Sequence, residues 1–205
     1  MVRCKTWAAV LAVTLSAGGP ALAQAVDWTK AGGDLFGRSE AHMAGTPADD
    51  PVEAPARLAA MDQPYQAEVE GAAALHGVDA RLLHALVIAE SGYRPEARSH
   101  AGAGGLTQLM PDTALELGVR NRFEPTENLR GGANYLARQL VRFQDVRLAL
   151  AAYNAGPARV ARLGRVPAIA ETEAYVAAVI DCYLALTAGR RVTSVRECRS
   201  TGGGQ

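Results

Sequence analysis

The residue that most clearly could do chemistry is a glutamate that falls where a helix would bury methyl groups. Glu90 stands four residues after Leu86 and eight after Leu82, so the three side chains share one face of a predicted helix. A carboxyl group held against apolar side chains resists ionisation, and its pKa rises. Such a group could keep its proton near neutral pH and donate it to a leaving oxygen. From Glu90 alone, a solvated or ion-paired glutamate at the helix margin is the simpler interpretation.

Two later segments place polar residues where a sugar ring could bind. Residues 99–111 (SHAGAGGLTQLMP) surround Gln108 with small residues, a composition that lets backbone approach a ligand closely. Tyr153 and Asn154 end an apolar segment, and an aromatic face beside an amide suits a sugar and its acetamido group. The simpler alternatives are a flexible loop for the first segment, and a core tyrosine followed by a C-capping asparagine for the second.

The elements that must position these residues are predicted to be helices. No useful length of the chain alternates with period two, whereas helical spacing recurs, so the sequence predicts an all-α fold with short loops. Asp79 is the predicted N-cap of the helix that ends near Glu90, and Gly77 ends the helix before it. Pro111 is allowed in the first turn of a continuing short helix. The predicted helices cover residues 65–77, 79–91, 104–118, 126–144, 146–156, 157–164 and 171–189. The longest carries an apolar stripe made of Leu129, Ala133, Leu136, Leu140 and Phe143.

The first 23 residues have the features of an export signal. Arg3 and Lys5 precede a short apolar stretch, and Ala23 ends a small-x-small pattern, so we predict cleavage after Ala23. An uncleaved membrane anchor is the alternative. The predicted organisation is a signal peptide (1–23), a disordered leader or linker (24–62), a folded catalytic domain (63–189) and a ragged, partly mobile C-terminal tail (190–205).

Charge and cysteine content limit the remaining classes of function. The 21 basic residues balance 21 acidic ones, so no global charge indicates nucleic acid or an anionic membrane as a partner. The chain after the signal keeps Cys182 and Cys198. An even count in an exported protein permits a disulfide between the tail and the last helix, although two free thiols would look the same in sequence. The four histidines are scattered, so no metal site is predicted. His84 lies off the face of Glu90 and is expected to be structural and partly exposed.

Four segments, taken together and in order, resemble the catalytic domain of the soluble lytic transglycosylases (the SLT domain), a branch of the lysozyme-like superfamily. They are HALVIAESGYRPEARSHAGAGGLTQLMPDTALELGV, PTENLRGGANYLARQL, LALAAYNAGPARV and ETEAYV. The resemblance covers about residues 63–188, and four ordered motifs are far more specific than any one of them. It implies an all-α, lysozyme-like domain of the goose type, with a substrate cleft, that acts on peptidoglycan.

The resemblance also implies roles for individual residues. Glu90 matches the family's sole catalytic acid and base. The other expected site residues support that group, line the cleft or lie beside the reacting sugar. They are Ser91, Ser99, Gln108, Tyr153, Asn154 and Tyr175. Thr107 stands where the family usually has a methionine that packs on the substrate, and His100 and Ala158 replace the usual proline and glycine.

The implied reaction is a lytic transglycosylation at the MurNAc–GlcNAc β-1,4 bond, ending in 1,6-anhydro-MurNAc. No second carboxylate within the motifs has the expected role, since Glu96, Asp112 and Glu116 have the pattern of surface residues. No cofactor and no metal are implied. The expected partner is a peptidoglycan glycan strand, bound by a monomer in the Gram-negative periplasm, and nucleic acid is not expected. A hydrolytic muramidase and a non-catalytic wall-binding component are the alternatives. Service to a secretion, conjugation or pilus apparatus stays open, as does general wall turnover.

Overall fold

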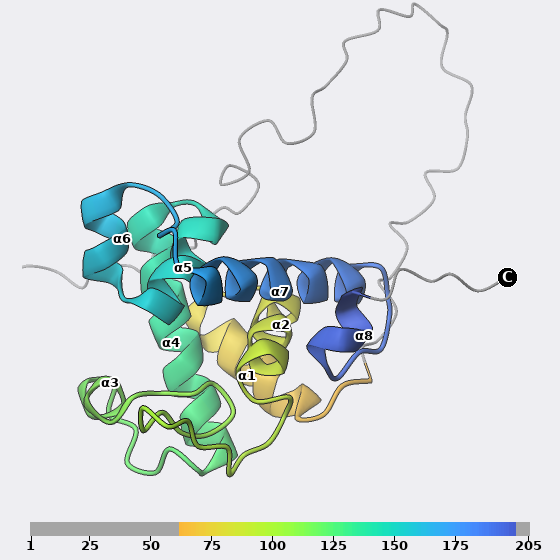
Figure 1. The fold of residues 1–205 in the computed structure, drawn as a ribbon. Helices are drawn as coiled ribbons and strands as arrows, with labels where there is room; N and C mark the ends of the chain where they lie inside the picture. The colour runs from red at the N-terminus through yellow and green to blue at the C-terminus, as the bar shows by residue number, and fades with distance from the viewer. Residues whose placement is uncertain (1–61, 200–205) are drawn as a thin grey trace, which may run out of the picture.

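The computed structural model describes residues 62–199, and these form a helical domain (Figure 1). The predicted signal peptide, all but the last residue of the predicted leader, and residues 200–205 lie outside the described residues. In the described part, helices follow one another without a strand, and only isolated bridges occur, so the predicted all-α class is confirmed. The helices are α1 (Gln66–His76), α2 (Ala80–Glu90), α3 (Pro111–Glu116), α4 (Pro125–Phe143), α5 (Val146–Ala155), α6 (Pro157–Leu163), α7 (Ala170–Thr187) and α8 (Val195–Arg199).

The helix that ends at Glu90 is the buried centre of the domain. Gly77 closes α1 in the left-handed conformation, and the carboxylate of Asp79 accepts hydrogen bonds from the backbone N–H groups of Arg81 and Leu82, at 2.7 and 3.2 Å. Both predicted caps are therefore confirmed. Every residue of α2 from Leu82 to Ile88 is buried, because α7 and α1 both pack against this helix. Such a helix holds its last residue in place from several sides.

The long helix α4 connects the two ends of the domain. Its predicted stripe faces the core: Leu129, Ala133 and Leu136 are inaccessible to solvent, and Leu140 is nearly so. α1 and α5 pack against α4, α6 follows at one end, and the lobe of α3 and its neighbouring loops lies at the other (Figure 1). No helix within residues 62–199 is by itself long and apolar enough to cross a membrane.

The prediction of a helix from residue 104 was wrong for its first half. The chain makes turns up to Met110, and α3 begins only at Pro111, which occupies its first turn as expected. Gly104 instead exchanges two backbone hydrogen bonds with Leu109, at 3.0 and 3.1 Å. A Cβ atom on Gly105 would lie 2.0 Å from a backbone oxygen of a neighbouring loop, so close approach of backbone decides this conformation.

The prediction of a ragged C-terminal tail was wrong for residues 190–199. Cys198 lies in α8 and forms a disulfide with Cys182 of α7, so the proposed pairing is confirmed. The Arg190 guanidinium donates hydrogen bonds to the carbonyl oxygens of Glu197 and Cys198, at 2.6 and 3.3 Å. A covalent bond between distant residues orders a segment whose own sequence has little periodicity.

Two glycines in helices should respond to alanine in opposite ways. A Cβ atom on Gly132 in α4 would lie 2.4 to 2.5 Å from three atoms of the buried Thr107 side chain, whereas one on Gly71 in α1 would meet nothing within 4 Å. We expect Gly132→Ala to lower the free energy of unfolding by about 1–3 kcal/mol through overpacking. Gly71→Ala should raise it by about 0.5–1 kcal/mol, since alanine loses less backbone entropy in a helix. Urea denaturation of both variants measures the difference, and shifts of the same sign would contradict it.

Candidate active site

The carboxyl group of Glu90 is enclosed at the C-terminal end of α2. The residue keeps only part of its surface exposed, and Glu90 Oε1 accepts a hydrogen bond of 2.7 Å from the Tyr175 hydroxyl. Burial raises the pKa of Glu90 to about 8, although the hydrogen bond from Tyr175 acts in the opposite direction. Among the described residues, Glu90 takes part in no ion pair. The alternative of a solvated or ion-paired glutamate is therefore wrong, and this group is protonated at neutral pH.

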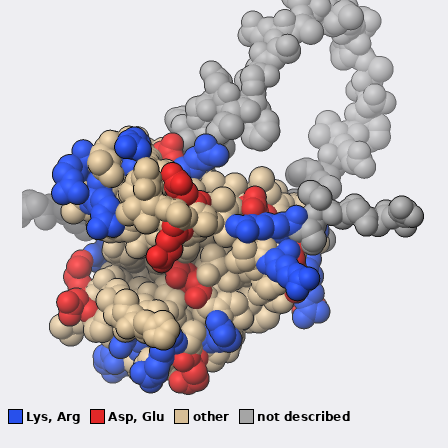
Figure 2. All heavy atoms as spheres, in the orientation of Figure 1, with Lys and Arg blue, Asp and Glu red and all other residues tan. Residues whose placement is uncertain are grey.

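Two tyrosines from different helices lie close to this carboxyl. Tyr175 comes from α7 and Tyr153 from α5, and in both cases burial first, and the nearby Glu90 charge second, raise the pKa of the phenol well above its ordinary value. The Tyr153 hydroxyl donates to the carbonyl oxygen of Thr107, at 3.0 Å. Two neutral phenols thus stand beside one neutral carboxyl. Figure 2 shows one face of the molecule hollowed between the α5–α6 end and the α3 lobe, with acidic side chains beside the hollow.

Ser91 connects the end of α2 to the glycine-rich loop. Its side chain is buried, and its hydroxyl lies 2.8 Å from the carbonyl oxygen of Leu106 and 3.2 Å from that of Val87, either of which can accept its proton. These hydrogen bonds therefore fix the position of the glycine-rich loop relative to the end of α2, where the catalytic candidate Glu90 lies. Ser91 thus links the two segments, and its role in the reaction, which the resemblance implied, stays a prediction.

The side chains of Gln108 and Ser99 form hydrogen bonds with backbone groups of the same glycine-rich loop. The Gln108 amide nitrogen donates to the carbonyl oxygens of Gly105 and Ala97, at 2.8 and 3.1 Å, and its backbone is in the left-handed region. The Ser99 hydroxyl accepts a hydrogen bond from the backbone N–H of Ala103 at 3.0 Å. Ser99 is exposed and Gln108 is half-buried, so a role for either in contacting a sugar stays a prediction.

Asn154 stands at the end of α5, beside Tyr153, and is exposed to solvent. Its side-chain oxygen accepts a hydrogen bond from the Thr172 hydroxyl of α7 at 2.9 Å. Because this bond occupies the oxygen, the amide nitrogen is the group oriented for donation to a ligand. α5 and α7 therefore present Tyr153, Asn154 and Tyr175 from one packed pair of helices.

Thr107 does not occupy the place that the resemblance suggested. Its side chain is fully buried, and its hydroxyl donates to the side-chain and backbone oxygens of Asn128, at 2.8 and 3.2 Å. It therefore contributes to the packing of the loop on α4 and has no surface for a substrate. Asn128, which the sequence reasoning missed, also donates to the carbonyl oxygens of Gly104 and Arg122. Its burial depends on the assembled loop and helix, so no local sequence signal pointed to it.

His84 is completely buried, so the prediction that it is partly exposed was wrong. Its Nδ1 lies 2.8 Å from the Tyr93 hydroxyl, and burial lowers the pKa of His84 to about 4. The expectation that Glu96, Asp112 and Glu116 are surface residues is confirmed, since all three are exposed.

Tyr135 of α4 is a second aromatic neighbour that sequence reasoning missed. Its ring lies 5.0 Å from that of Tyr153, in a tilted arrangement. Aromatic pairs in this geometry stabilise each other beyond the area that they bury. Tyr135 therefore stabilises the position of the Tyr153 ring. Because the chain has few aromatic residues, each of them was worth considering, and this was the sequence signal that could have pointed to Tyr135.

Tyr175→Phe should separate the two effects of the Tyr175 hydroxyl on Glu90. Without the 2.7 Å hydrogen bond, the ionised carboxylate loses a donor, so the pKa of Glu90 should rise further, by about one unit. The alkaline limb of the pH–rate profile should move up accordingly, while the maximal rate of glycan cleavage falls about tenfold because the carboxyl is less well oriented. Tyr183→Phe is the matched control, since Tyr183 lies on the same helix but beside Asp79. A profile for Tyr175→Phe that coincides with that of the control would contradict the expectation.

The fold and the site define a helical protein with one enclosed acid group between two tyrosines. The family model described as the Transglycosylase SLT domain matches residues 68–176, just over half of the 205-residue chain. The chain belongs to this family.

Curated relatives and solved structures agree with this assignment. The chain is 46% identical over 88 residues to a transglycosylase of the Enterobacteria phage PRD1, covering 43% of this chain and 33% of that one. It is 36% identical over 137 residues to a membrane-bound lytic murein transglycosylase F of Shewanella pealeana, covering 62% of this chain and 28% of that one. The matched part thus spans a third or less of these relatives. The lytic transglycosylase Slt of Pseudomonas aeruginosa, solved as an inactive variant with a glutamate replaced by glutamine, aligns with a TM-score of 0.54 and 30% identity over 62% of this chain and 24% of that one.

Proposed function

We propose that this protein is a lytic transglycosylase that cleaves the MurNAc–GlcNAc β-1,4 bond of peptidoglycan and leaves a 1,6-anhydro-MurNAc end. The observation that carries the proposal is the enclosed carboxyl of Glu90, whose pKa of about 8 keeps it protonated at neutral pH. A proton donor in this state is what the departure of a glycosidic oxygen requires. Family membership supports the reaction class.

In the proposed reaction one carboxyl group acts twice. Neutral Glu90 gives its proton to the bridging oxygen as the bond from that oxygen to the anomeric carbon breaks. The acetamido oxygen of the same sugar supports the positive charge that develops at this carbon. The Glu90 carboxylate then takes the proton of the C6 hydroxyl as the C6 oxygen bonds to the anomeric carbon, so no water is consumed. The Tyr175 hydroxyl, 2.7 Å from Glu90 Oε1, stabilises the carboxylate between the two proton transfers.

Substrate positioning is assigned to groups around this acid. Asn154 is oriented by Thr172 so that its amide can donate to a sugar, and the half-buried Tyr175 offers part of its surface to the ring. Tyr153 is buried beside them, and we assign it a place next to the reacting sugar. Ser99 and Gln108 belong to the loop that we propose as the opposite wall of the cleft. Orientation of the two reacting groups of one sugar accounts for a large part of the rate in an intramolecular ring closure.

The Pseudomonas aeruginosa relative is inactive as a variant with one glutamate replaced by glutamine, which supports a glutamate as the acid in the proposed reaction. The relatives named membrane-bound lytic murein transglycosylases support action on the cell wall, and we place this chain in the cell envelope, in the periplasm after cleavage of its signal peptide. The phage transglycosylase is consistent with service to a machine that must cross the wall, such as a secretion, conjugation or pilus apparatus. We propose that the protein acts as a monomer.

Product analysis of purified sacculi tests the proposed function. The protein, without its predicted signal peptide, is incubated with sacculi, and the soluble muropeptides are examined by mass spectrometry. Products that lack the mass of one water relative to hydrolysed muropeptides are expected. Products of full hydrolytic mass would assign the protein as a hydrolytic muramidase, and binding without release of muropeptides would assign it as a wall-binding component. Either result would overturn the proposal.

A further inference from the structure

The turn directly after Glu90 has an unusual backbone. Gly92 and Tyr93 are both in the left-handed region, with φ of 56° and 61°. A residue with a side chain seldom adopts this conformation unless its surroundings hold it there. Because Glu90 is the last residue of α2, this turn begins at the very next residue, and its backbone adjoins the acid. The partners of Tyr93 are therefore relevant to the position of Glu90.

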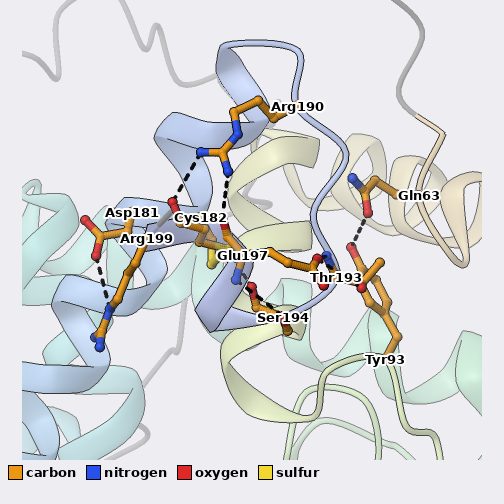
Figure 3. Close-up of a disulfide and its surroundings, with 10 residues drawn as sticks. Gln63, Tyr93, Asp181, Cys182, Arg190, Thr193, Ser194, Glu197 and Arg199 are labelled. Carbon is orange, nitrogen blue, oxygen red and sulfur yellow. Dashed lines mark hydrogen bonds and ion pairs between the residues drawn. A yellow bond between two sulfur atoms is a disulfide. The ribbon is translucent and has the colours of Figure 1, made fainter. Parts of the chain in front are cut away.

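Tyr93 is held from two sides by buried polar groups. Its hydroxyl lies 2.8 Å from His84 Nδ1. It also lies 3.5 Å from the side-chain amide of Gln63 (Figure 3). With its amide nitrogen and oxygen exchanged, Gln63 donates through its nitrogen to the carbonyl oxygen of Val192 at 2.9 Å, and its oxygen accepts from the Val192 N–H at 3.2 Å. In this orientation the amide atom that faces the Tyr93 hydroxyl is the nitrogen. Gln63 and Val192 are both buried, so these bonds form away from solvent. The segment just before α1 thus connects the turn to the C-terminal part of the chain.

Residues 190–199, which we call the C-terminal clasp, also run beside the turn. The backbone oxygen of Thr193 would lie 3.7 Å from a Cβ atom added to Gly92, so the clasp leaves room for a methyl group between itself and the turn, and Gly92 stays exposed. Hydrogen bonds within the clasp hold its two ends together (Figure 3). The Glu197 carboxylate accepts hydrogen bonds from the N–H and hydroxyl of Thr193. The Arg190 guanidinium donates to the carbonyl oxygens of Glu197 and Cys198.

The disulfide fastens the clasp to the helix that contacts Glu90. Cys182 lies seven residues after Tyr175 in α7, which is two helical turns and therefore the same face. This face packs on α2, where Val179 between them is fully buried. One covalent bond thus joins the helix that carries Tyr175 to the segment that runs beside the turn after Glu90.

We propose that the C-terminal clasp is a positioning element for Glu90, which keeps the turn Ser91–Tyr93 closed and the carboxyl aligned with Tyr175. The proposal rests on the proposed function, because it concerns the acid of that reaction. It assigns a role in catalysis to a disulfide and a tyrosine that contact neither the sugar nor the carboxyl. Tyr93 and Val192 are positioning residues in this sense, and Glu90 remains the catalytic residue.

The test compares the steady-state kinetics of the wild-type protein and of the double variant Cys182→Ala/Cys198→Ala on isolated glycan strands. Circular dichroism first verifies that both proteins are folded at the assay temperature. We expect kcat to fall about tenfold, with KM changed less than about twofold, because a small displacement of the acid lowers the rate without removing sugar contacts. Tyr93→Phe, which keeps the ring and removes only the hydroxyl, should lower kcat in the same way by about threefold.

Two controls distinguish positioning from a general loss of stability. Val69→Ala truncates a fully buried side chain in α1, far along the chain from the clasp, and lowers the melting temperature without touching it. Its kcat should equal that of the wild type at the same temperature. In the background of Tyr175→Phe, removal of both cysteines should have a smaller effect than in the wild type, because the alignment that the clasp protects is already lost.

The outcomes separate the two proposals. If the folded cysteine variant keeps the wild-type kcat, or loses no more than Val69→Ala, the clasp proposal is overturned and the proposed function stands. Additive effects of Tyr175→Phe and the cysteine removal would overturn it as well. If the cysteine variant does not fold, an unchanged kcat of Tyr93→Phe overturns it. A wild-type protein that releases no product overturns the proposed function, and the clasp proposal with it.

Discussion

Replacing Glu90 by glutamine is expected to lower the rate of glycan cleavage about a thousandfold or more, with the fold retained, since general acid–base catalysis contributes factors of about 10²–10⁴ and this group acts twice. Glutamine has nearly the same shape, and its oxygen can still accept the hydrogen bond that Tyr175 donates to Glu90 at 2.7 Å. It cannot deliver a proton. The enclosed site thus keeps its geometry and loses its acid. Release of soluble muropeptides from sacculi measures the effect, and circular dichroism reports on the fold.

The matched control for this variant is Glu96→Gln. It makes the same chemical change on an exposed glutamate of the following loop, so it removes one negative charge from the same part of the molecule. We expect its rate to remain near that of the wild type. The Glu90→Gln protein should still sediment with sacculi, because the groups assigned to sugar binding are unchanged. Substantial turnover by purified Glu90→Gln would show that another residue supplies the proton.

The second large effect is the loss of activity as the solution becomes alkaline. Because burial raises the pKa of Glu90 to about 8, the carboxyl is protonated below this pH and ionised above it. Only the protonated form can give a proton to the glycosidic oxygen, so kcat should be nearly constant from mildly acidic to neutral pH. Above about pH 8 it should fall about tenfold per unit, following the fraction of protonated acid.

A pH series on isolated glycan strands, each point taken within the range where the protein stays folded, measures this limb. The sign is opposite to that of a carboxylate acting first as a base, for which the rate would rise as the group ionises. The expected profile therefore distinguishes the two roles of Glu90. A rate that rises steadily above pH 8, or a midpoint near the ordinary pKa of a glutamic acid, would contradict an enclosed proton donor.

Local sequence signals predicted most of the helices, because their causes lie within a few residues. Asp79 caps α2 through hydrogen bonds to the N–H groups of Arg81 and Leu82, and Gly77 adopts the left-handed conformation that ends α1. Such effects involve neighbours in the chain and leave a pattern there. The turns between Gly104 and Met110 were mispredicted as helix because their conformation is set by the close approach of Gly105 to other parts of the chain.

For the site too, some features could be predicted from the sequence and others could not. Spacing along the chain placed Glu90 on the apolar face of its helix and made a raised pKa one of two interpretations, and the structure shows that burial does raise it. The family resemblance, and not the spacing alone, favoured that interpretation. Spacing was not enough to orient Thr107, whose side chain turns inward to Asn128, 21 residues away, and has no surface left for a sugar. A buried amide that satisfies several backbone groups is a property of the assembled loop and helix.

By itself, the sequence determined the helical class, the caps and the position of one acid on a buried face, because these depend on periodicity and on neighbouring residues. Only the tertiary structure decided that Tyr175 donates to Glu90, that Ser91 joins the glycine-rich loop, and that Cys198 of α8 is bonded to Cys182 of α7. The physical reason is that these contacts join groups from 15 to 85 residues apart, at distances set by the packing of whole helices, and no local pattern encodes such distances.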